Sequence, residues 1–249
     1  MPTRKLSAGL LLLVPTLLSA GTMGQITISP AYSWVITLSG GPAWADNPGK
    51  SQTLSLQPDV FKNYAVDNAS ETLGLGGLFI GFQKNINPSW LGQLGFAIEA
   101  VSKITVRGDI WEDADPDFNN YWYQYDIRPI RIALKGKILT DIRFWALPYL
   151  SGSLGVSFNR ASDYSIIPKI PEEIPAPFFS SKTETSLSYS IGAGLQKQFH
   201  SNWSAGVGYE FADWGRSQLG RAPGQTLGNG LSDSHLYTHT LQFNVTFIA

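Results

Sequence analysis

From residue 32 onwards, apolar and polar residues alternate with a period of two, the spacing at which successive side chains of a β-strand face opposite sides. The pattern is clearest near the C-terminus, where Leu241, Phe243 and Val245 alternate with uncharged polar residues. The same alternation predicts eight strands, within residues 33–39, 78–82, 93–107, 121–138, 150–158, 183–199, 203–211 and 237–247. The chain is therefore expected to be all-β.

The connections between these strands alternate in length. Short links are expected at 85–89, 139–144 and 200–202, and long polar links at 44–71, 108–120, 160–182 and 216–233. This alternation is typical of barrels in the outer membrane of bacteria. An even number of strands lets the sheet close, which leaves no unpaired backbone edge in lipid.

The sequence thus predicts an eight-stranded antiparallel up-and-down transmembrane β-barrel, with short periplasmic turns and four long extracellular loops. A soluble sandwich or lipocalin-like barrel would need more Lys and Glu on its polar face than 183–199 and 237–247 carry. A short alternation at 53–56 leaves a ten-strand count open, and we expect a hairpin above the membrane there.

The segment 121–138 departs from simple alternation. Its apolar residues are odd-numbered up to Ile127 and even-numbered from Ile130 onwards. A change of parity requires an extra residue, so a β-bulge is predicted at Arg128 and Pro129. In the preceding strand, Ile104 and Val106 are expected to share the lipid-facing side.

The N-terminus predicts export from the cytoplasm. Arg4 and Lys5 precede an apolar stretch at 10–18, followed by small residues, as in a cleaved secretory signal. We expect residues 1–24 to be the signal, cut somewhere within 20–24, and 25–249 to be a single barrel domain. No stretch is apolar enough for a membrane-spanning helix.

Charge and composition exclude several classes of protein. With 18 Lys and Arg against 19 Asp and Glu, the chain lacks the basic excess of a nucleic-acid binder. It contains no Cys, so disulfides, thiolate nucleophiles and cysteine-based metal sites are ruled out. No cofactor is expected.

Two stretches resemble the small outer-membrane β-barrels of Gram-negative bacteria, the opacity-protein-like surface antigens. They are 206–220, which reads GVGYEFADWGRSQLG, and the terminal FNVTFIA at 243–249. The resemblance implies a surface or structural role without catalytic residues. It also implies that the barrel-assembly machinery reads an aromatic residue of the last strand, here Phe247, which stands two residues before the end.

Charged residues on the predicted polar face form a candidate lumen network. An eight-stranded barrel is just wide enough to be filled by its own side chains, and unpaired charges there are costly. We therefore expect mutual pairing rather than an open pore among Glu99, Lys103, Arg107, Asp126, Arg128, Arg131, Lys135, Lys137 and Glu210.

The long loops offer candidate binding residues. Trp44, Trp111, Phe178 and Phe179 are aromatic anchors of the kind that binding surfaces use. The proline-rich run 167–179 favours an extended, semi-rigid backbone. The alternating acidic residues of 113–119 lack the Gly and distal Glu of an EF-hand, so no metal is expected.

These features predict a non-enzymatic surface protein of the bacterial outer membrane, structural or adhesive through its loops. A narrow pore for small solutes is the main alternative. A third is a lipid-modifying hydrolase that uses His235 or His239 with nearby Ser and Asp. Expected partners are outer-membrane lipid or lipopolysaccharide and an extracellular protein or host ligand, and the chain is expected to be a monomer.

Overall fold

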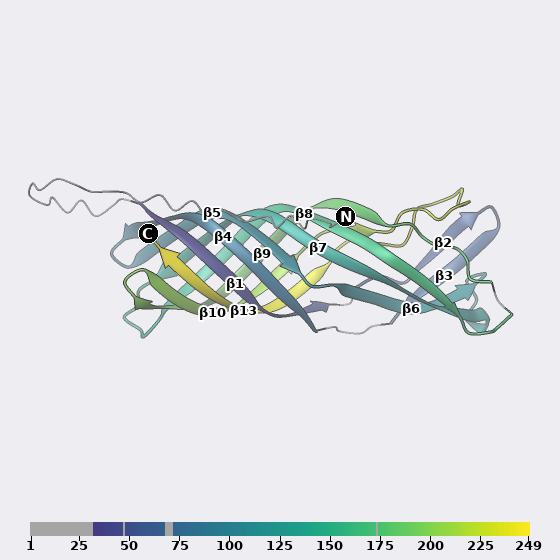
Figure 1. Cartoon of the computed structure of the whole chain (residues 1–249), viewed down its shortest axis with the longest axis horizontal. Coiled ribbons are helices and arrows are strands. Elements are labelled where there is room, and N and C mark those ends of the chain that lie inside the picture. The colour runs from purple at the N-terminus through teal and green to yellow at the C-terminus, as the bar shows by residue number, and fades with distance from the viewer. Residues whose placement is uncertain (1–31, 47, 68–71, 173) are drawn as a thin grey trace, which may run out of the picture. The chain divides into compact units, whose positions relative to one another are not determined.

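The computed structural model describes residues 32–46, 48–67, 72–172 and 174–249, so the expected signal segment lies outside the described residues. Eight strands close into an antiparallel ring in the order β7-β5-β4-β1-β13-β10-β9-β8, and β8 pairs back onto β7. Figure 1 shows these strands as a tilted barrel wall. The predicted eight-stranded barrel is confirmed.

The elements follow one another along the chain with a single short 3-10 helix, η1, among the described residues. Their bounds are β1 Ser33–Asp46, β2 Gln52–Gln57, β3 Val60–Val66, β4 Thr72–Asn87, β5 Trp90–Val101, β6 Ile104–Glu112, η1 Pro116–Phe118, β7 Asn119–Thr140, β8 Leu147–Pro168, β9 Lys182–His200, β10 Trp203–Asp213, β11 Ser217–Gln218, β12 Ser232–Asp233 and β13 Tyr237–Ile248. No helix in this part of the chain is long and apolar enough to cross a membrane.

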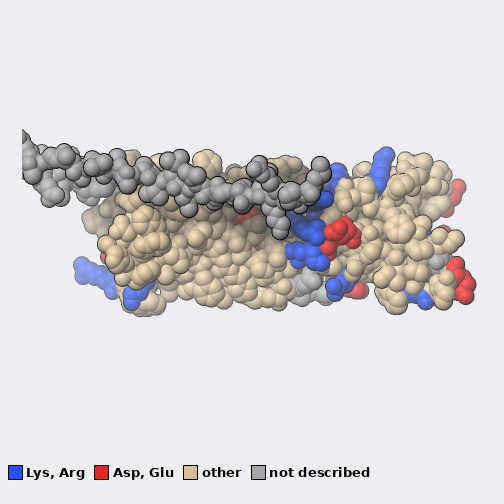
Figure 2. Space-filling view, in the orientation of Figure 1, with Lys and Arg blue, Asp and Glu red and all other residues tan. Residues whose placement is uncertain are grey.

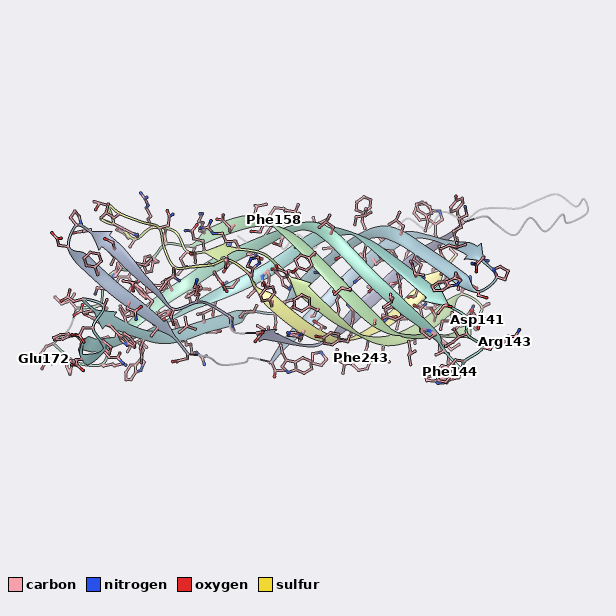
Figure 3. The ribbon with its side chains drawn as sticks, turned by 180° about the vertical axis from the view of Figure 1, so that it is seen from behind. Asp141, Arg143, Phe144, Phe158, Glu172 and Phe243 are labelled. Carbon is pink, nitrogen blue, oxygen red and sulfur yellow. The ribbon has the colours of Figure 1, made fainter. Side chains whose placement is uncertain are left out.

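Short turns lie at one end of the barrel and long connections at the other. Figure 3 places the β7–β8 turn, with Asp141, Arg143 and Phe144, opposite the end that carries Glu172. The β4–β5 and β9–β10 turns are shorter still, with two residues each, at 88–89 and 201–202. By the usual orientation of such barrels, the turn end is periplasmic and the other end extracellular.

Half of the barrel wall carries an apolar band on its outside. Outward residues such as Phe96, Ile132 and Leu154 are exposed, while inward positions of the same wall are polar, as for Thr240 and Gln242 on β13. Phe158 and Phe243 project from the outside of the wall in Figure 3. On the face shown in Figure 2, this half is almost free of charge, as lipid contact requires.

Beyond this band the wall continues as an extracellular extension. There the apolar side chains point inward and the polar ones outward, the reverse of the band. β6 continues β5, and the β2–β3 hairpin pairs with β6, so the hairpin expected near 53–56 lies above the membrane. Inside the extension lies an apolar core that includes Tyr64, Tyr123 and Ile127. Burial raises the pKa of the Tyr64 and Tyr123 phenols above its ordinary value.

The predicted bulge at Arg128 and Pro129 is wrong, and the inversion of the apolar face explains the change of parity instead. These residues pair regularly with Arg160 and Asn159 of β8, and odd-numbered residues of β7 face inward along its whole length. The apolar residues change parity because water surrounds the upper part of β7 and lipid the lower part. The apolar face therefore points inward above and outward below.

The extra residues that interrupt regular pairing with β7 lie on the strands beside it. Between β5 and β6 the register passes from Ala100 opposite Ile130 to Ile104 opposite Ile127, which leaves one extra residue at 101–103. β8 holds another extra residue near Asp163, whose φ is +58°. The first bulge turns Ile104 and Val106 inward, and both are buried there rather than facing lipid as predicted.

Candidate functional site

The centre of the barrel holds a buried cluster of four charged residues, which we call the ion cluster: Glu99, Arg131, Lys135 and Glu210. Arg131 Nε donates to Glu99 Oε2 at 2.5 Å, and its Nη2 donates to Glu210 Oε1 at 2.6 Å. Lys135 Nζ lies 2.8 Å from Glu99 Oε1 and 2.6 Å from Glu210 Oε2. Two cations and two carboxylates thus neutralise one another.

The strands explain how the ion cluster forms. Glu99 of β5 stands directly opposite Arg131 of β7, and Lys135 is two inward positions further along β7. Glu210 reaches the same point from β10, on the other side of β8 and β9. At this level of the barrel the inward residues of those two strands are small, as Ser153 and Ser190 illustrate, so the long side chains have room to meet.

Trp214 covers the ion cluster on its extracellular side. The guanidinium carbon of Arg131 lies 4.7 Å from the centre of the indole ring, a cation–π contact. Trp214 Nε1 donates to Thr238 Oγ1 at 2.8 Å, and the Trp214 carbonyl accepts from Asn159 Nδ2 at 2.7 Å. Trp214 is fully buried, as are Leu219 and Leu231 of the β10–β13 connection, which folds into the mouth of the barrel.

The periplasmic side of the ion cluster is also filled. Lys137 Nζ donates to Gln196 Oε1 at 2.5 Å and lies 3.9 Å above the centre of the Tyr149 ring. A cavity beside these residues measures about 40 Å³. This is enough for a few water molecules and too little for a solute.

Four of the nine predicted lumen residues lie on the outside of the wall instead. Lys103, Arg107 and Arg128 are exposed, and Asp126 lies beside them with its Oδ2 3.3 Å from Lys103 Nζ. Even-numbered residues of β7 face outward, and the bulge at 101–103 turns Lys103 and Arg107 outward on the next strand. The other five of the nine predicted residues do lie in the lumen: Glu99, Arg131, Lys135, Lys137 and Glu210.

The outward charges include a basic row just above the apolar band, formed by Lys103, Arg128 and Arg160. Arg128 and Arg160 stand directly opposite one another on β7 and β8, two positions above the apolar pair Ile130 and Phe158. Arg128 Nη2 lies 2.9 Å from Asp163 Oδ2. Arg160 has no carboxylate within 4.0 Å in the described part of the chain.

The extracellular end carries an apolar cleft of about 340 Å³ where three segments converge. The β2–β3 hairpin contributes Val60 and Lys62, the proline-rich segment contributes Phe178, and the β10–β13 connection contributes Pro223. Lys62 Nζ joins the walls through Glu112 Oε1 at 2.7 Å and the Ala176 carbonyl at 3.0 Å. The cleft can take an apolar side chain.

The four predicted aromatic anchors do not form one surface. Phe178 is 52% exposed in the cleft, whereas Phe179 is buried with its ring centre 5.7 Å from that of Tyr64. Trp111 is half-buried on β6, and Trp44 lies on β1 in the wall rather than in a loop. Phe179 thus holds the proline-rich segment while Phe178 is presented to solvent.

A second set of contacts fixes the start of the proline-rich segment. Lys169 Nζ lies 2.8 Å from Asp109 Oδ1 and 2.6 Å from Asn119 Oδ1, and 5.0 Å from the centre of the Trp122 ring. Partial burial on its own raises the pKa of Asp109, but hydrogen bonds from Lys169 and Asn119 and the ammonium charge hold it below its ordinary value. In the neighbouring loop, Asp115 caps η1 by accepting from the Asp117 amide.

The two histidines of the hydrolase alternative have other partners. His235 Nδ1 lies 2.8 Å from Asp213 Oδ2, and His239 Nδ1 bonds to the Tyr209 hydroxyl. Among the described residues no serine hydroxyl bonds to either ring. The described residues around His235 and His239 therefore do not form a serine–histidine–acid triad.

The comparisons with known proteins concern the whole barrel. The family model described as "Outer membrane protein beta-barrel domain" matches residues 31–248. Similar solved structures include neisserial surface protein A, with 14% identity, coverage of 86% of this chain and 96% of that chain, and a TM-score of 0.44. A second is OprG from Pseudomonas aeruginosa, with 18% identity, the same two coverages and a TM-score of 0.47.

A third is Ail, the attachment invasion locus protein of Yersinia pestis, with 14% identity, coverage of 88% and 99%, and a TM-score of 0.36. A search among curated proteins finds no match.

Proposed function

Because the chain belongs to the outer membrane protein β-barrel domain family, we propose that it is a closed surface barrel that binds an extracellular protein partner through the cleft around Phe178. The observation that carries this proposal is the exposure of Phe178 beside a buried Phe179. An aromatic side chain held exposed on a fixed segment, at the meeting point of three extracellular segments, is the arrangement of a binding anchor. The lumen supports the same view, since the ion cluster and Trp214 fill it.

The pore and hydrolase alternatives have less support. A pore needs a continuous water-filled path, and the ion cluster, Trp214, Lys137 and Tyr149 occupy the cross-section of the barrel in succession. A hydrolase needs a nucleophile beside its base, and His235 and His239 bond to Asp213 and Tyr209 instead.

Replacement of Phe178 by Ser is expected to weaken partner binding at least tenfold, because tenfold corresponds to about 1.4 kcal/mol and interface anchors contribute about 2 kcal/mol or more. The probe is a random peptide library displayed on phage and selected against the barrel in lipid nanodiscs. Affinities of the enriched peptides are then measured for the native chain and for Phe178→Ser.

The matched control is Ile174→Ser, which changes an exposed apolar residue of the same segment outside the cleft. Equal losses for the two variants would argue against the cleft.

In planar bilayers the native barrel is expected to carry no steady current. Ion-selective steps that change with Glu99→Gln would support the pore instead.

The basic row supports a second partner, the anionic phosphates of lipopolysaccharide in the outer leaflet. Arg128 and Arg160 are like charges directly opposite one another, an arrangement that is unfavourable unless anions lie between them. Asp163 pairs directly with Arg128 and acts on Arg160 only through its charge at longer range, so the donors of Arg160 can bind a lipid phosphate. The row stands where the apolar band ends, at the expected level of the head groups.

Arg160→Gln is expected to reduce the stabilisation that lipopolysaccharide gives the barrel by about 1 kcal/mol, the usual contribution of one Arg at an anionic membrane surface. Unfolding by urea is compared in phospholipid vesicles with and without added lipopolysaccharide. Arg143→Gln, an exposed Arg in the β7–β8 turn, serves as the control and should leave the increment unchanged. If lipopolysaccharide stabilised Arg160→Gln as much as the native chain, a contact between Arg160 and a lipid phosphate would be ruled out.

A further inference from the structure

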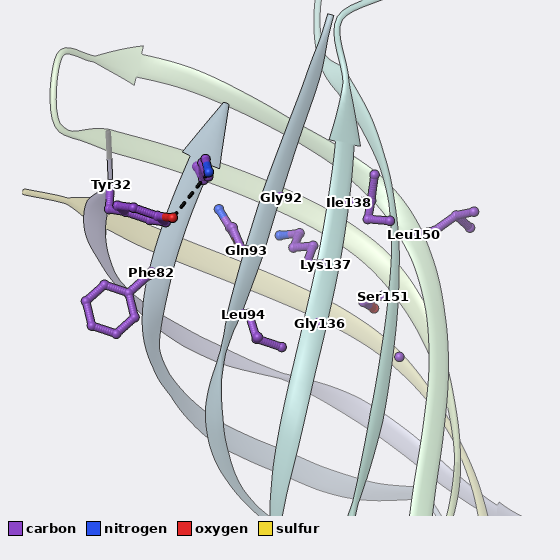
Figure 4. Close-up of a pocket in the computed structure, with 12 residues that line it drawn as sticks. Tyr32, Phe82, Gly92, Gln93, Leu94, Gly136, Lys137, Ile138, Leu150 and Ser151 are labelled. Carbon is purple, nitrogen blue, oxygen red and sulfur yellow. Dashed lines mark hydrogen bonds between the residues drawn. The ribbon is translucent and has the colours of Figure 1, made fainter. Parts of the chain in front are cut away.

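The apolar band is interrupted near its periplasmic end by a groove of about 860 Å³, shown in Figure 4. This volume lies in the range of small-molecule binding sites, about 300–1,000 Å³. Its walls are apolar side chains of four neighbouring strands: Phe82 on β4, Leu94 on β5, Ile138 on β7 and Leu150 on β8. All four are exposed and face the lipid.

Glycines make the floor of the groove. Gly136 of β7 stands directly opposite Gly152 of β8, with Leu94 on the other side of Gly136. A Cβ at Gly136 would lie 3.9 Å from its nearest neighbour and one at Gly152 would lie 3.7 Å away, so both positions have room for a side chain. The groove therefore exists because side chains are absent there, although Gly weakens a strand.

One end of the groove is polar and cationic. Lys84 lies on β4, a few residues before the turn at 88–89, with its Nζ 3.2 Å from the Tyr32 hydroxyl and 4.9 Å from the centre of that ring. Figure 4 marks this hydrogen bond at the edge of the groove. Lys84 has no carboxylate within 4.0 Å in the part of the chain that the structure describes, so its charge is left for an outside anion.

We propose that this groove binds one glycerophospholipid of the periplasmic leaflet, with an acyl chain over Gly136 and Gly152 and the phosphate at Lys84 and Tyr32. The apolar walls match a hydrocarbon chain. The ammonium and the phenol supply donors for phosphate oxygens at the level of the membrane interface. A second copy of the chain fits less well, because a two-fold contact through this face would add a second unpaired Lys84 and no carboxylate to match it.

The test measures lipid binding to the folded barrel by native mass spectrometry in a non-ionic detergent, with dioleoyl phosphatidylglycerol as the probe. The native chain is expected to bind one molecule more tightly than any further ones. The double variant Gly136→Leu with Gly152→Leu fills the floor and is expected to abolish this tight site. Gly76→Leu is the matched control, since Gly76 is exposed, lies outside the groove and has no atom within 4 Å of the place where a Cβ would stand.

The head-group contact is tested separately. Lys84→Gln is expected to weaken binding of phosphatidylglycerol about fivefold, from the usual contribution of one Lys near an anionic surface, and to leave binding of uncharged dioleoylglycerol unchanged. Lys197→Gln is the control, because Lys197 is exposed at the same end and lies over the Trp145 ring, outside the groove. Heat-dependent migration in gels verifies that every variant is folded.

Three results would overturn the proposal. They are equal lipid binding by the filled and native barrels, an equal effect of Lys84→Gln and Lys197→Gln, and a dimer that replaces bound lipid in the native chain. None of these depends on the extracellular cleft, so they leave the proposed partner binding untouched.

Discussion

Replacement of Arg131 by Met is expected to lower the free energy of unfolding by about 3–5 kcal/mol, the usual loss when one partner of a buried ion pair is removed. Arg131 is fully buried and holds both Glu99 and Glu210. Without it, two buried carboxylates face the single ammonium of Lys135. The measurement is unfolding by urea in phospholipid vesicles, followed by tryptophan fluorescence.

A matched substitution and a compensating one make this result specific. Arg128→Met removes an Arg three residues away whose side chain is 47% exposed on the outer face, so the loss is expected to stay below about 1 kcal/mol. Addition of Glu99→Gln to Arg131→Met leaves one cation facing one carboxylate, and this double variant is expected to regain at least half of the lost stability. Similar losses for Arg128→Met and Arg131→Met would contradict the buried ion cluster.

Replacement of Trp214 by Ala is expected to cost about 3–5 kcal/mol, the usual loss for a large aromatic residue in a core. The change removes the ring that lies over Arg131 and the hydrogen bond to Thr238, and it leaves a cavity between the ion cluster and the β10–β13 connection. We therefore also expect faster proteolysis within 215–236. Unfolding by urea and limited proteolysis in vesicles measure the two effects.

One further variant separates the contribution of the Trp214 ring from that of its hydrogen bond, and another serves as a control. Trp214→Phe keeps an aromatic ring over Arg131 but loses the Nε1 donor, so the part of its loss due to the hydrogen bond is expected to be about 1 kcal/mol. Trp122→Ala, which removes an exposed Trp of the extracellular extension, serves as the control. If Trp214→Ala were no more damaging than Trp122→Ala, Trp214 would not be the lid of the lumen.

The strands and the polar lumen face could be predicted because each depends on local spacing alone. Along β9, β10 and β13, one parity is apolar and exposed to lipid, and the other is small or polar and faces the lumen. The lengths of the connections between strands identified the two ends of the barrel, with short turns at one end and long loops at the other. The pairing of Glu99 with Arg131 also follows from spacing, once β5 and β7 are recognised as neighbours.

Other assignments failed where the surroundings of one strand change along its length. Alternation reports which face is apolar, but it does not report whether water or lipid lies outside. For Tyr123 the apolar face is the inner one, and for Ile132 on the same strand it is the outer one. This change was predicted as a bulge, and the true bulge at 101–103 carries no signal that alternation alone would detect. Lys103, Arg107 and Arg128 were assigned to the lumen for this reason.

The sequence by itself thus determined the class of the protein and the end at which the long loops lie, and it predicted the eight strands of the ring while leaving ten open. These features follow from periodicity and turn composition, which act over a few residues. Only the tertiary structure decided which charges share the lumen, that Trp214 closes it, that Phe178 rather than Phe179 is exposed, and that Gly136 and Gly152 open a groove. Each of these depends on residues from separate strands meeting across the sheet or the barrel, and their distance in space is set by closure and register rather than by their spacing in the chain.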